Sequence, residues 1–289
     1  MLPQLIVSGI AQGILYALVA LSMTMVYRAT TVVNFGHGDL VMGGAFVVYI
    51  LVIYLGIPYV PAALLALAVL FAVGVAIQRG LIQWILAGPH LALAMMALAV
   101  GYALRGGARI LWGREVLPFP RIFPERSYVV GDVVVTADNL IISGVVLALM
   151  ALLFALFYAT RAGKLIQAVF QTQRGATLVG INVGAVHGWM WGGGAALGAL
   201  GGVLLAPITF LYPDMGVWVL VRGFAAMTLG GFGSFHGAVV GGVILGVVEL
   251  VLGAYVSTAF IDISAYVVVV AVLLLRPDGL FGRQAVARI

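Results

Sequence analysis

The amino-acid sequence predicts an all-α, polytopic membrane protein, and three features of its composition lead to that prediction. Hydrophobic residues make up 64% of the chain and charged residues 8%, against about 45–50% and about 25% in an ordinary globular domain. The mean hydropathy is +1.22. Long apolar runs recur along the chain, so too few polar residues remain to cover a water-exposed surface. These features exclude a soluble globular domain.

Each predicted span is an apolar run long enough to cross about 30 Å of hydrocarbon, which takes about 20 helical residues. The run at 217–232 is short and contains Arg222, so the sequence predicts a bundle of eight or nine spans. No basic residue precedes Arg28, so the first run lacks the positive start of a secretory signal and is expected to be retained. The runs lie at residues 5–27, 37–56, 60–78, 90–112, 140–160, 188–210, 217–232, 236–256 and 261–276.

Lys and Arg residues outside the spans set the predicted orientation, because cytoplasmic loops carry an excess of them. Nine spans with the N-terminus outside and the C-terminus inside place most of these residues in the cytoplasm. The cytoplasmic residues are then Arg28, Arg79, Arg161, Lys164, Arg174, Arg276, Arg283 and Arg288, and the external ones are Arg114, Arg121 and Arg126.

Two long connections hold most of the polar residues of a chain that we predict to be a single transmembrane domain, 1–289. The external loop 113–139 contains three prolines and a Val-rich patch at 133–135, which favours a small hairpin. The cytoplasmic loop 161–187 is the other. A short echo of Asn34-Phe35-Gly36-His37-Gly38 in Phe235-His236-Gly237 predicts two weakly repeated halves, as in some transporters.

Glycine is abundant in the spans, with 39 in the chain, and pairs spaced by four recur. Small residues at this spacing allow close approach of helix backbones, so we predict mainly helix packing, with pore lining or flexing as the alternative. The spaced residues are Gly9 and Gly13, then Gly194, Gly198 and Gly202, then Gly242 and Gly246.

The residues of catalysis, metal binding and nucleotide binding do not cluster in this sequence. Its nine acidic residues lie more than four positions apart, its four histidines are isolated, and it has no cysteine. There is no G-x-x-x-x-G-K-[ST] phosphate loop. The net charge of +5 comes from scattered basic residues, without the clustered basic face of a nucleic-acid-binding protein. We therefore expect no catalytic or metal site, no bound cofactor and no nucleic-acid partner.

Ionisable residues inside spans are candidates for function, because charge at membrane depth is costly. Glu249 lies deepest in an apolar stretch. One interpretation makes it a structural partner, with Arg222 as its counter-ion, and another makes it the proton site of a secondary carrier. Arg222 either lies at the membrane interface or lines a polar cavity. Arg105 and Arg109, four residues apart near a span end, are interpreted as an interfacial pair.

The segment Asn34-Phe35-Gly36-His37-Gly38-Asp39 places two glycines and several polar groups at the entry to a span. It is either a cytoplasmic turn in which Asn34 caps the next helix, or a helix break that lines a translocation path. Non-helical backbone at membrane depth is tolerated only where protein or a cavity surrounds it.

The cytoplasmic loop predicts a short amphipathic helix that ends at a glycine and is followed by an apolar tip. Leu165, Ile166, Val169 and Phe170 share one face at helical spacing, whereas Gln167, Gln171 and Arg174 share another. Such an element is either a docking site for a soluble partner or a helix lying on the membrane surface.

Several motifs in order along the chain resemble those of permease subunits of branched-chain amino acid ABC importers, specifically the H-type subunit. The resemblance spans residues 5 to 283. Its motifs are Gly9 and Gly13, Tyr16-Ala17-Leu18, Asn34 to Asp39, Gly180-Ile181-Asn182, Gly223-Phe224-Ala225, Leu229 to Ser234, Gly241-Gly242 and Arg276 to Arg283. The chain departs from the family at Gln167-Ala168 and Gln171-Thr172, where the family loop carries Arg-Ala and an acidic residue, and at Asp39, which replaces Glu.

The resemblance implies a heteromeric importer in the bacterial inner membrane, for branched-chain or other small amino acids or for related solutes such as urea and amides. Its implied partners are a second permease subunit, two cytoplasmic ATPases that hold ATP and Mg²⁺, and an external substrate-binding protein. Together with the cost of charge at membrane depth, the resemblance leads us to predict Asn34, His37, Asp39, Arg222 and Glu249 as path residues. The implied ATPase contacts are Gln167, Gln171, Arg174, Gly180, Ile181 and Asn182. The alternative function is a secondary carrier that uses Glu249 as its coupling group.

Overall fold

The computed structural model describes residues 1–86, 88–119, 126–131 and 133–282. The contacts of the chain divide it into two compact units. Unit 1 comprises Met1–Thr24, Phe123–Gly144 and Trp218–Ile289, and unit 2 comprises Met25–Ile122 and Val145–Val217. Our prediction of a single transmembrane domain is left untested by this division.

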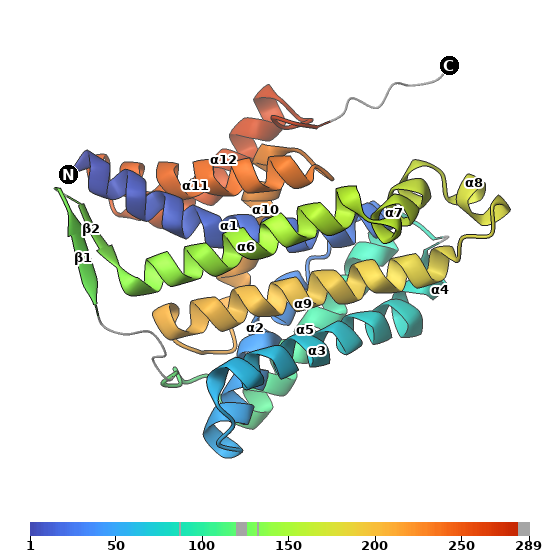
Figure 1. Cartoon of the computed structure of the whole chain (residues 1–289), viewed down its shortest axis with the longest axis horizontal. Helices are drawn as coiled ribbons and strands as arrows, with labels where there is room; N and C mark the ends of the chain where they lie inside the picture. Colours follow the sequence, from blue (N-terminus) through green and yellow to red (C-terminus); the bar gives the residue numbers. More distant parts are fainter. Residues whose placement is uncertain (87, 120–125, 132, 283–289) are drawn as a thin grey trace. The chain divides into compact units, whose positions relative to one another are not determined.

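Helices make up most of the described chain, as predicted from its composition (Figure 1). Seven helices in this part are long and apolar enough to span a membrane. Two shorter apolar helices accompany them, so each of the nine predicted apolar runs corresponds to an apolar helix. The seven are α1 (Leu2–Thr30), α2 with η1 (His37–Tyr54), α3 with η2 and α4 (Tyr59–Ile85), α5 (His90–Trp112), α6 (Ala137–Ala159), α9 (Val183–Thr209) and α11 (Phe235–Tyr255). The shorter ones are α10 (Met215–Gly230) and α12 (Ala259–Leu275).

One predicted span is longer than the sequence indicated. The run at 60–78 was expected to end at Gln78, but helix continues through the π-helical turn η2 (Gln78–Ile82) and α4 (Gln83–Ile85). Gln78 and Ile82 are buried in this extension, so packing outweighs the polarity of Gln78 and Arg79.

In unit 1, α1 and α11 cross where their spaced glycines meet. A Cβ on Gly13 would lie 2.7 Å from Val243 Cα, and one on Gly9 would lie 2.7 Å from Val247 Cα. From the other side, Gly246 contacts Gly9 and Gly13. The backbones of the two helices therefore approach closely, and the predicted packing role of these glycines is confirmed.

The C-terminal motif of the chain packs against the end of α10 in unit 1. The backbone N–H groups of Leu280 and Phe281 donate to the carbonyls of Leu229 and Gly230, both at 2.9 Å. Gly231 and Gly279 have φ angles of 104° and 75°, which favour glycine. Two of the motifs that carry the family resemblance thus form one joint structure.

The hairpin predicted in the external loop is present. Strands β1 (Ser127–Val130) and β2 (Val133–Thr136) pair antiparallel, with Val130 opposite Val133, and α6 begins directly after β2 at Ala137. The side chain of Gln4 both donates to and accepts from the backbone of Val134, at 2.9 and 2.7 Å. This bidentate contact fixes the start of α1 to the hairpin.

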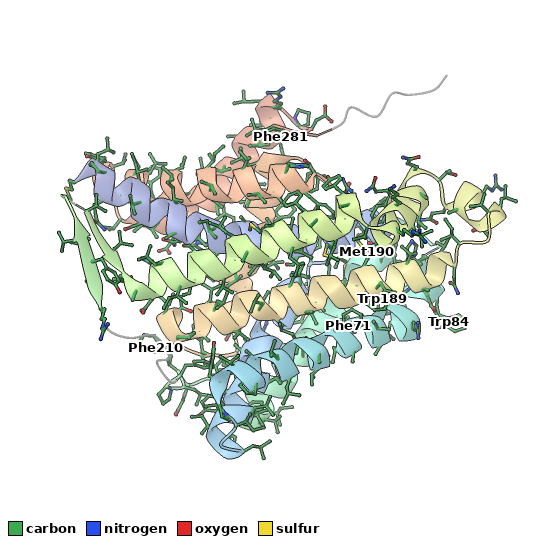
Figure 2. The ribbon with its side chains drawn as sticks, in the orientation of Figure 1. Phe71, Trp84, Trp189, Met190, Phe210 and Phe281 are labelled. Atoms are coloured by element: carbon green, nitrogen blue, oxygen red, sulfur yellow. The ribbon has the colours of Figure 1, made fainter. Side chains whose placement is uncertain are left out.

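In unit 2, α9 lies against α2 and α3 and supplies much of the core. One cluster of buried apolar side chains joins α2, α3 and the C-terminal half of α9 and includes Met42, Phe46, Ala62, Val203 and Ala206. On the outer side, Phe71 and Trp189 meet edge to face with 5.1 Å between ring centroids (Figure 2). Trp84 and Trp189 are 77% and 64% exposed, as in the aromatic belts that membrane helices place at the interface.

Candidate functional site

The turn between α1 and α2 contains the first group of predicted path residues. Asn34 Oδ1 accepts a hydrogen bond from Gly36 N–H at 3.0 Å. Gly36, not Asn34, is the residue that precedes α2, and no side chain in the described part of the chain caps this helix. The predicted capping role of Asn34 is therefore wrong: its short side chain stabilises the turn two residues further on instead.

This turn lies at the level of the middle of two neighbouring helices. Gly36 packs against Ala97 and against Gly101, the central residue of α5. A Cβ on Gly198, near the middle of α9, would lie 2.9 Å from Nε2 of His37. His37 and Asp39 are 0% and 1% exposed. Helix α2 thus begins inside unit 2, with its first turn enclosed by α5 and α9.

Ion pairs hold the start of α2 and the start of α10 to the same helix, α5. Arg105 Nε and Nη2 donate to the two carboxylate oxygens of Asp39 at 2.7 and 3.0 Å. Arg109 Nη2 pairs with Asp214, which directly precedes α10. Whether the two arginines lie at the membrane interface stays a prediction, but the side chain of Arg105 is only 12% exposed and so is largely enclosed by protein. Each arginine pairs with an acid that is distant in sequence.

The second group of predicted path residues forms a buried network in unit 1. Arg222 Nη2 and Nε donate to Glu249 Oε1 at 3.0 and 3.2 Å. Arg222 also donates to the Ile261 carbonyl at 2.9 Å and lies 3.9 Å over the Trp218 ring. Tyr16 OH donates to Glu249 at 3.2 Å. Glu249 is 0% exposed, and the predicted pairing with Arg222 is confirmed.

The predicted path residues therefore fall into two groups, each assembled within one unit. Asn34, His37 and Asp39 lie in unit 2, and Arg222 and Glu249 lie in unit 1. Whether any of them contacts a transported solute stays a prediction. Among the described residues, no three His, Asp or Glu side chains come together as a metal site would require.

The predicted docking loop consists of two short helices and not one. Helix α7 (Arg161–Gln171) is capped by Thr160, whose side chain accepts a hydrogen bond from Gly163 N–H. Helix α8 (Gln173–Leu178) is capped by Thr172, whose side chain accepts a hydrogen bond from Gly175 N–H. The apolar tip that follows is strongly exposed, with Leu178 and Val179 at 87% and 76%.

The residues predicted to contact an ATPase differ in what they do within this element. Gln171 and Arg174 are exposed. Gln167 points inward, because its amide donates to the Phe157 carbonyl at 2.7 Å. Gly180 has a φ of 81°, a backbone conformation that favours glycine. The Ile181 N–H donates a hydrogen bond to the Ala176 carbonyl. Asn182 caps α9 by accepting from Ala185 N–H at 2.9 Å, so the loop ends there and not at 187.

Three buried polar residues of unit 2 were not singled out from the sequence as site residues. Gln78, His187 and Trp191 are 1%, 2% and 3% exposed. Gln78 stood at the edge of a predicted span and His187 in a predicted loop, so neither position indicated burial. Apolar residues continue on both sides of each of these residues, and this continuation would have indicated that they are buried.

A fold of long apolar helices with charged and polar side chains enclosed between them defines a multi-pass α-helical membrane protein. Residues 5–276 match the family described as the permease component of the branched-chain amino acid transport system, and the chain belongs to this family.

Named relatives are similar to the chain over almost its full length. It is 30% identical to the high-affinity branched-chain amino acid transport system permease protein LivH of Escherichia coli K12, over 98% of this chain and 96% of that protein. It is 29% identical to the corresponding protein BraD of Pseudomonas aeruginosa, over 99% of this chain and 97% of that one. The predicted family resemblance is confirmed.

A solved structure shares the fold. The structure described as PsaBC from Streptococcus pneumoniae in complex with Fab matches with a TM-score of 0.51 at 16% identity, over 95% of this chain and 92% of that chain. At this identity the likeness concerns the fold alone.

Proposed function

We propose that this chain is the membrane-spanning permease subunit of an ATP-driven importer for branched-chain or other small amino acids, or for related small solutes such as urea and short amides. The observation that carries the proposal is the match to the permease family over residues 5–276. The names of LivH and BraD, which both describe high-affinity branched-chain amino acid transport, support the substrate class.

The proposed assembly contains a second permease subunit, two cytoplasmic ATPases and an external substrate-binding protein. On this proposal the chain catalyses no reaction, and ATP and Mg²⁺ are held by the ATPases. The N-terminus lies outside and the C-terminus inside, in the bacterial inner membrane. This orientation places α7 and α8 in the cytoplasm, where the exposed Leu178 and Val179 are available to an ATPase.

A contact in unit 2 supports α7 as the element that transmits ATPase movement. The Arg28 guanidinium, near the end of α1, lies 5.2 Å from the ring centroid of Phe157 in α6 and 5.7 Å from that of Phe170 in α7. A displacement of α7 therefore acts directly on the end of α1. Switching transitions of this kind move packed helices as rigid bodies.

Co-purification tests the proposal. The chain is co-expressed with the products of its neighbouring genes, and the variant Leu178→Asp/Val179→Asp is compared with Val129→Asp, which changes a similarly exposed apolar residue of the hairpin. We expect the ATPases to be retained by the wild type and by Val129→Asp but lost from the double variant. Purification of the wild type without ATPases, together with solute uptake in vesicles that lack ATP, would contradict the importer.

A further inference from the structure

Three buried side chains in the described part of unit 2 have polar atoms that find no hydrogen-bond partner there. They are both amide atoms of Gln78, Nε2 of His187 and Nε1 of Trp191. Unpartnered buried polar groups are destabilising, and those that a native protein keeps call for an explanation. The surroundings are helices of membrane-spanning length, where orphan polar groups are still less favourable.

The three side chains lie along one seam between η2 and α9. The Cβ of a side chain at Gly188 would lie 3.5 Å from Oε1 of Gln78, which places this amide against α9. His187 and Trp191 are four residues apart on α9 and so share a face of that helix. Gln78 also opens the π-helical turn η2, a rare geometry that is frequent at functional sites.

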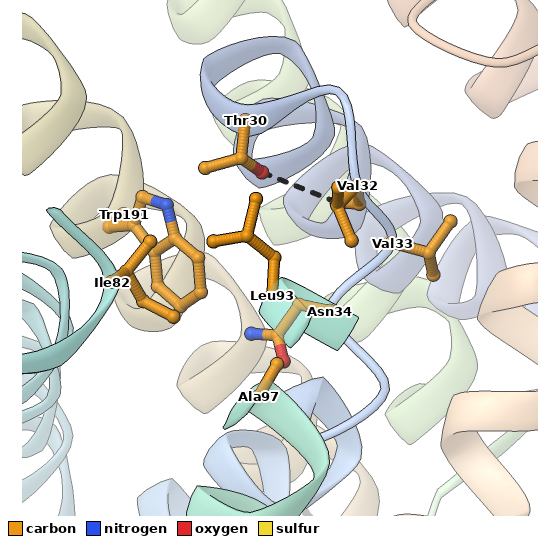
Figure 3. A pocket seen from close by; sticks show the side chains of 8 residues that line it. All are labelled: Thr30, Val32, Val33, Asn34, Ile82, Leu93, Ala97 and Trp191. Atoms are coloured by element: carbon orange, nitrogen blue, oxygen red, sulfur yellow. Dashed lines mark hydrogen bonds between the residues drawn. The ribbon is translucent and has the colours of Figure 1, made fainter. Parts of the chain in front are cut away.

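The seam ends at a small pocket, which Trp191 lines. Figure 3 shows Trp191 and Ile82 facing Leu93 and the turn between α1 and α2. Apart from the indole of Trp191, Thr30 and Asn34, the lining side chains are aliphatic: Val32, Val33, Ile82, Leu93 and Ala97.

The chemistry of the seam and pocket fits a small solute that has both a polar and an aliphatic part. The amide of Gln78 offers a donor and an acceptor, and the indole of Trp191 offers a donor. No Asp, Glu, Lys or Arg is among the described residues that line the pocket, so a zwitterion would be passed on and not trapped by a strong ion pair. A small aliphatic amino acid has this make-up.

The pocket wall is connected to α7. Thr30 lines the pocket and lies two residues after Arg28, whose guanidinium rests over the ring of Phe170 in α7. A movement of α7 therefore reaches the turn that faces Trp191 through one cation–π contact.

We propose that Gln78, His187 and Trp191 line the inner section of the solute path in this subunit, closed in this structure and opened when α7 moves. In the open state, water or the passing amino acid supplies the hydrogen bonds that are missing here. The proposal rests on the proposed importer function and adds to it the residues and the solute chemistry of one section of the path.

Cysteine accessibility tests the opening directly, because the chain has no cysteine of its own. Gln78→Cys and Trp191→Cys are reconstituted in the complete transporter and treated with a water-soluble maleimide, with and without ATP and vanadate. We expect labelling to be at least about fivefold faster in one nucleotide state than in the other. Ser264→Cys, at a buried serine of unit 1 whose hydroxyl is also unpartnered, is expected to stay unlabelled in both states.

Transport measurements supply the second readout. Gln78→Leu and Trp191→Phe are expected to lower ATP-driven uptake of radiolabelled leucine about three- to tenfold, the effect of one or two lost hydrogen bonds, at unchanged thermal stability. Trp189→Phe, on the exposed side of α9, is expected to transport like the wild type.

The two proposals fail in different ways. If the wild type takes up leucine with ATP but these variants do so at the wild-type rate and neither cysteine is ever labelled, the inner section lies elsewhere and the importer stands. If the wild type itself shows no ATP-driven uptake of leucine, urea or short amides, the importer function is overturned.

Discussion

The buried network around Glu249 in unit 1 and the group of Gln78, His187 and Trp191 in unit 2 differ in whether their polar atoms have partners. In unit 1, Glu249 accepts from Arg222 and Tyr16, and the guanidinium has further contacts with the Ile261 carbonyl and the Trp218 ring. In unit 2, Gln78, His187 and Trp191 retain unpartnered atoms. A satisfied buried network rigidifies the helices that form it, whereas an unsatisfied one is costly to bury and calls for a functional explanation. We therefore assign the first to structure and the second to transport.

The largest expected effect is on stability, from removing one member of the pair in unit 1. Arg222→Met leaves Glu249 buried and unpaired, which costs about 3–5 kcal/mol for a buried ion pair. We expect a large fall in the midpoint of thermal unfolding in detergent, measured by size-exclusion chromatography of heated samples. Arg222→Met/Glu249→Leu removes both charges and is expected to recover most of the loss. A single variant as stable as the wild type would show that the pair does not hold unit 1 together.

The two ion pairs of α5 offer a graded comparison within unit 2. The side chains of Asp39 and Arg105 are 2% and 12% exposed, whereas those of Asp214 and Arg109 are 42% and 34% exposed. Asp39→Asn is expected to cost about 2–3 kcal/mol because it leaves a mostly buried guanidinium unpaired. Asp214→Asn is expected to cost no more than about 1 kcal/mol, as for exposed pairs. Equal shifts in the unfolding midpoint of the two variants would contradict the role of burial.

A smaller effect is expected at the start of α9. Asn182→Ala removes the side chain that caps this helix at Ala185 N–H, at a cost of about 1 kcal/mol. Asn182→Asp keeps the cap and serves as the control. Because α8 leads directly into this cap, we also expect weaker retention of ATPases by Asn182→Ala than by Asn182→Asp in co-purification. Equal retention by both would show that the cap does not position the docking element.

The smallest expected effect on stability is that of Gln78→Leu, and it tests most directly whether the two units differ. Gln78→Leu removes two unpartnered amide atoms, so it sacrifices no hydrogen bond and adds buried apolar surface. We expect an unfolding midpoint equal to or slightly above that of the wild type. A fall comparable to that of Arg222→Met would mean that Gln78 is bonded in the folded protein and that the two sites do not differ.

Much of the fold could be predicted from the sequence, because hydropathy dominates in a chain of this composition. Every predicted apolar run coincides with an apolar helix, and the hairpin and the glycine contacts of α1 with α11 were also predicted. The pairing of Arg222 with Glu249 followed from the cost of isolated charge in a membrane. These features depend on local composition or on a choice between very few partners.

The remaining features depend on contacts between distant segments. The pairing of Arg105 with Asp39 joins residues 66 positions apart, and no local pattern indicates it. The burial of Gln78 and His187 follows from the packing of η2 against α9. The inward direction of Gln167 is set by a carbonyl of the preceding helix, although its spacing placed it on the polar face of α7.

One measurement tests the assignment of the two units most directly. It is the initial rate of ATP-driven leucine uptake per folded transporter for Arg222→Met/Glu249→Leu, in proteoliposomes with the ATPases and the binding protein. The account predicts a rate close to that of the wild type, because this network serves structure. If uptake is abolished while the complex assembles and hydrolyses ATP, Glu249 and Arg222 take part in transport and the contrast drawn here is wrong.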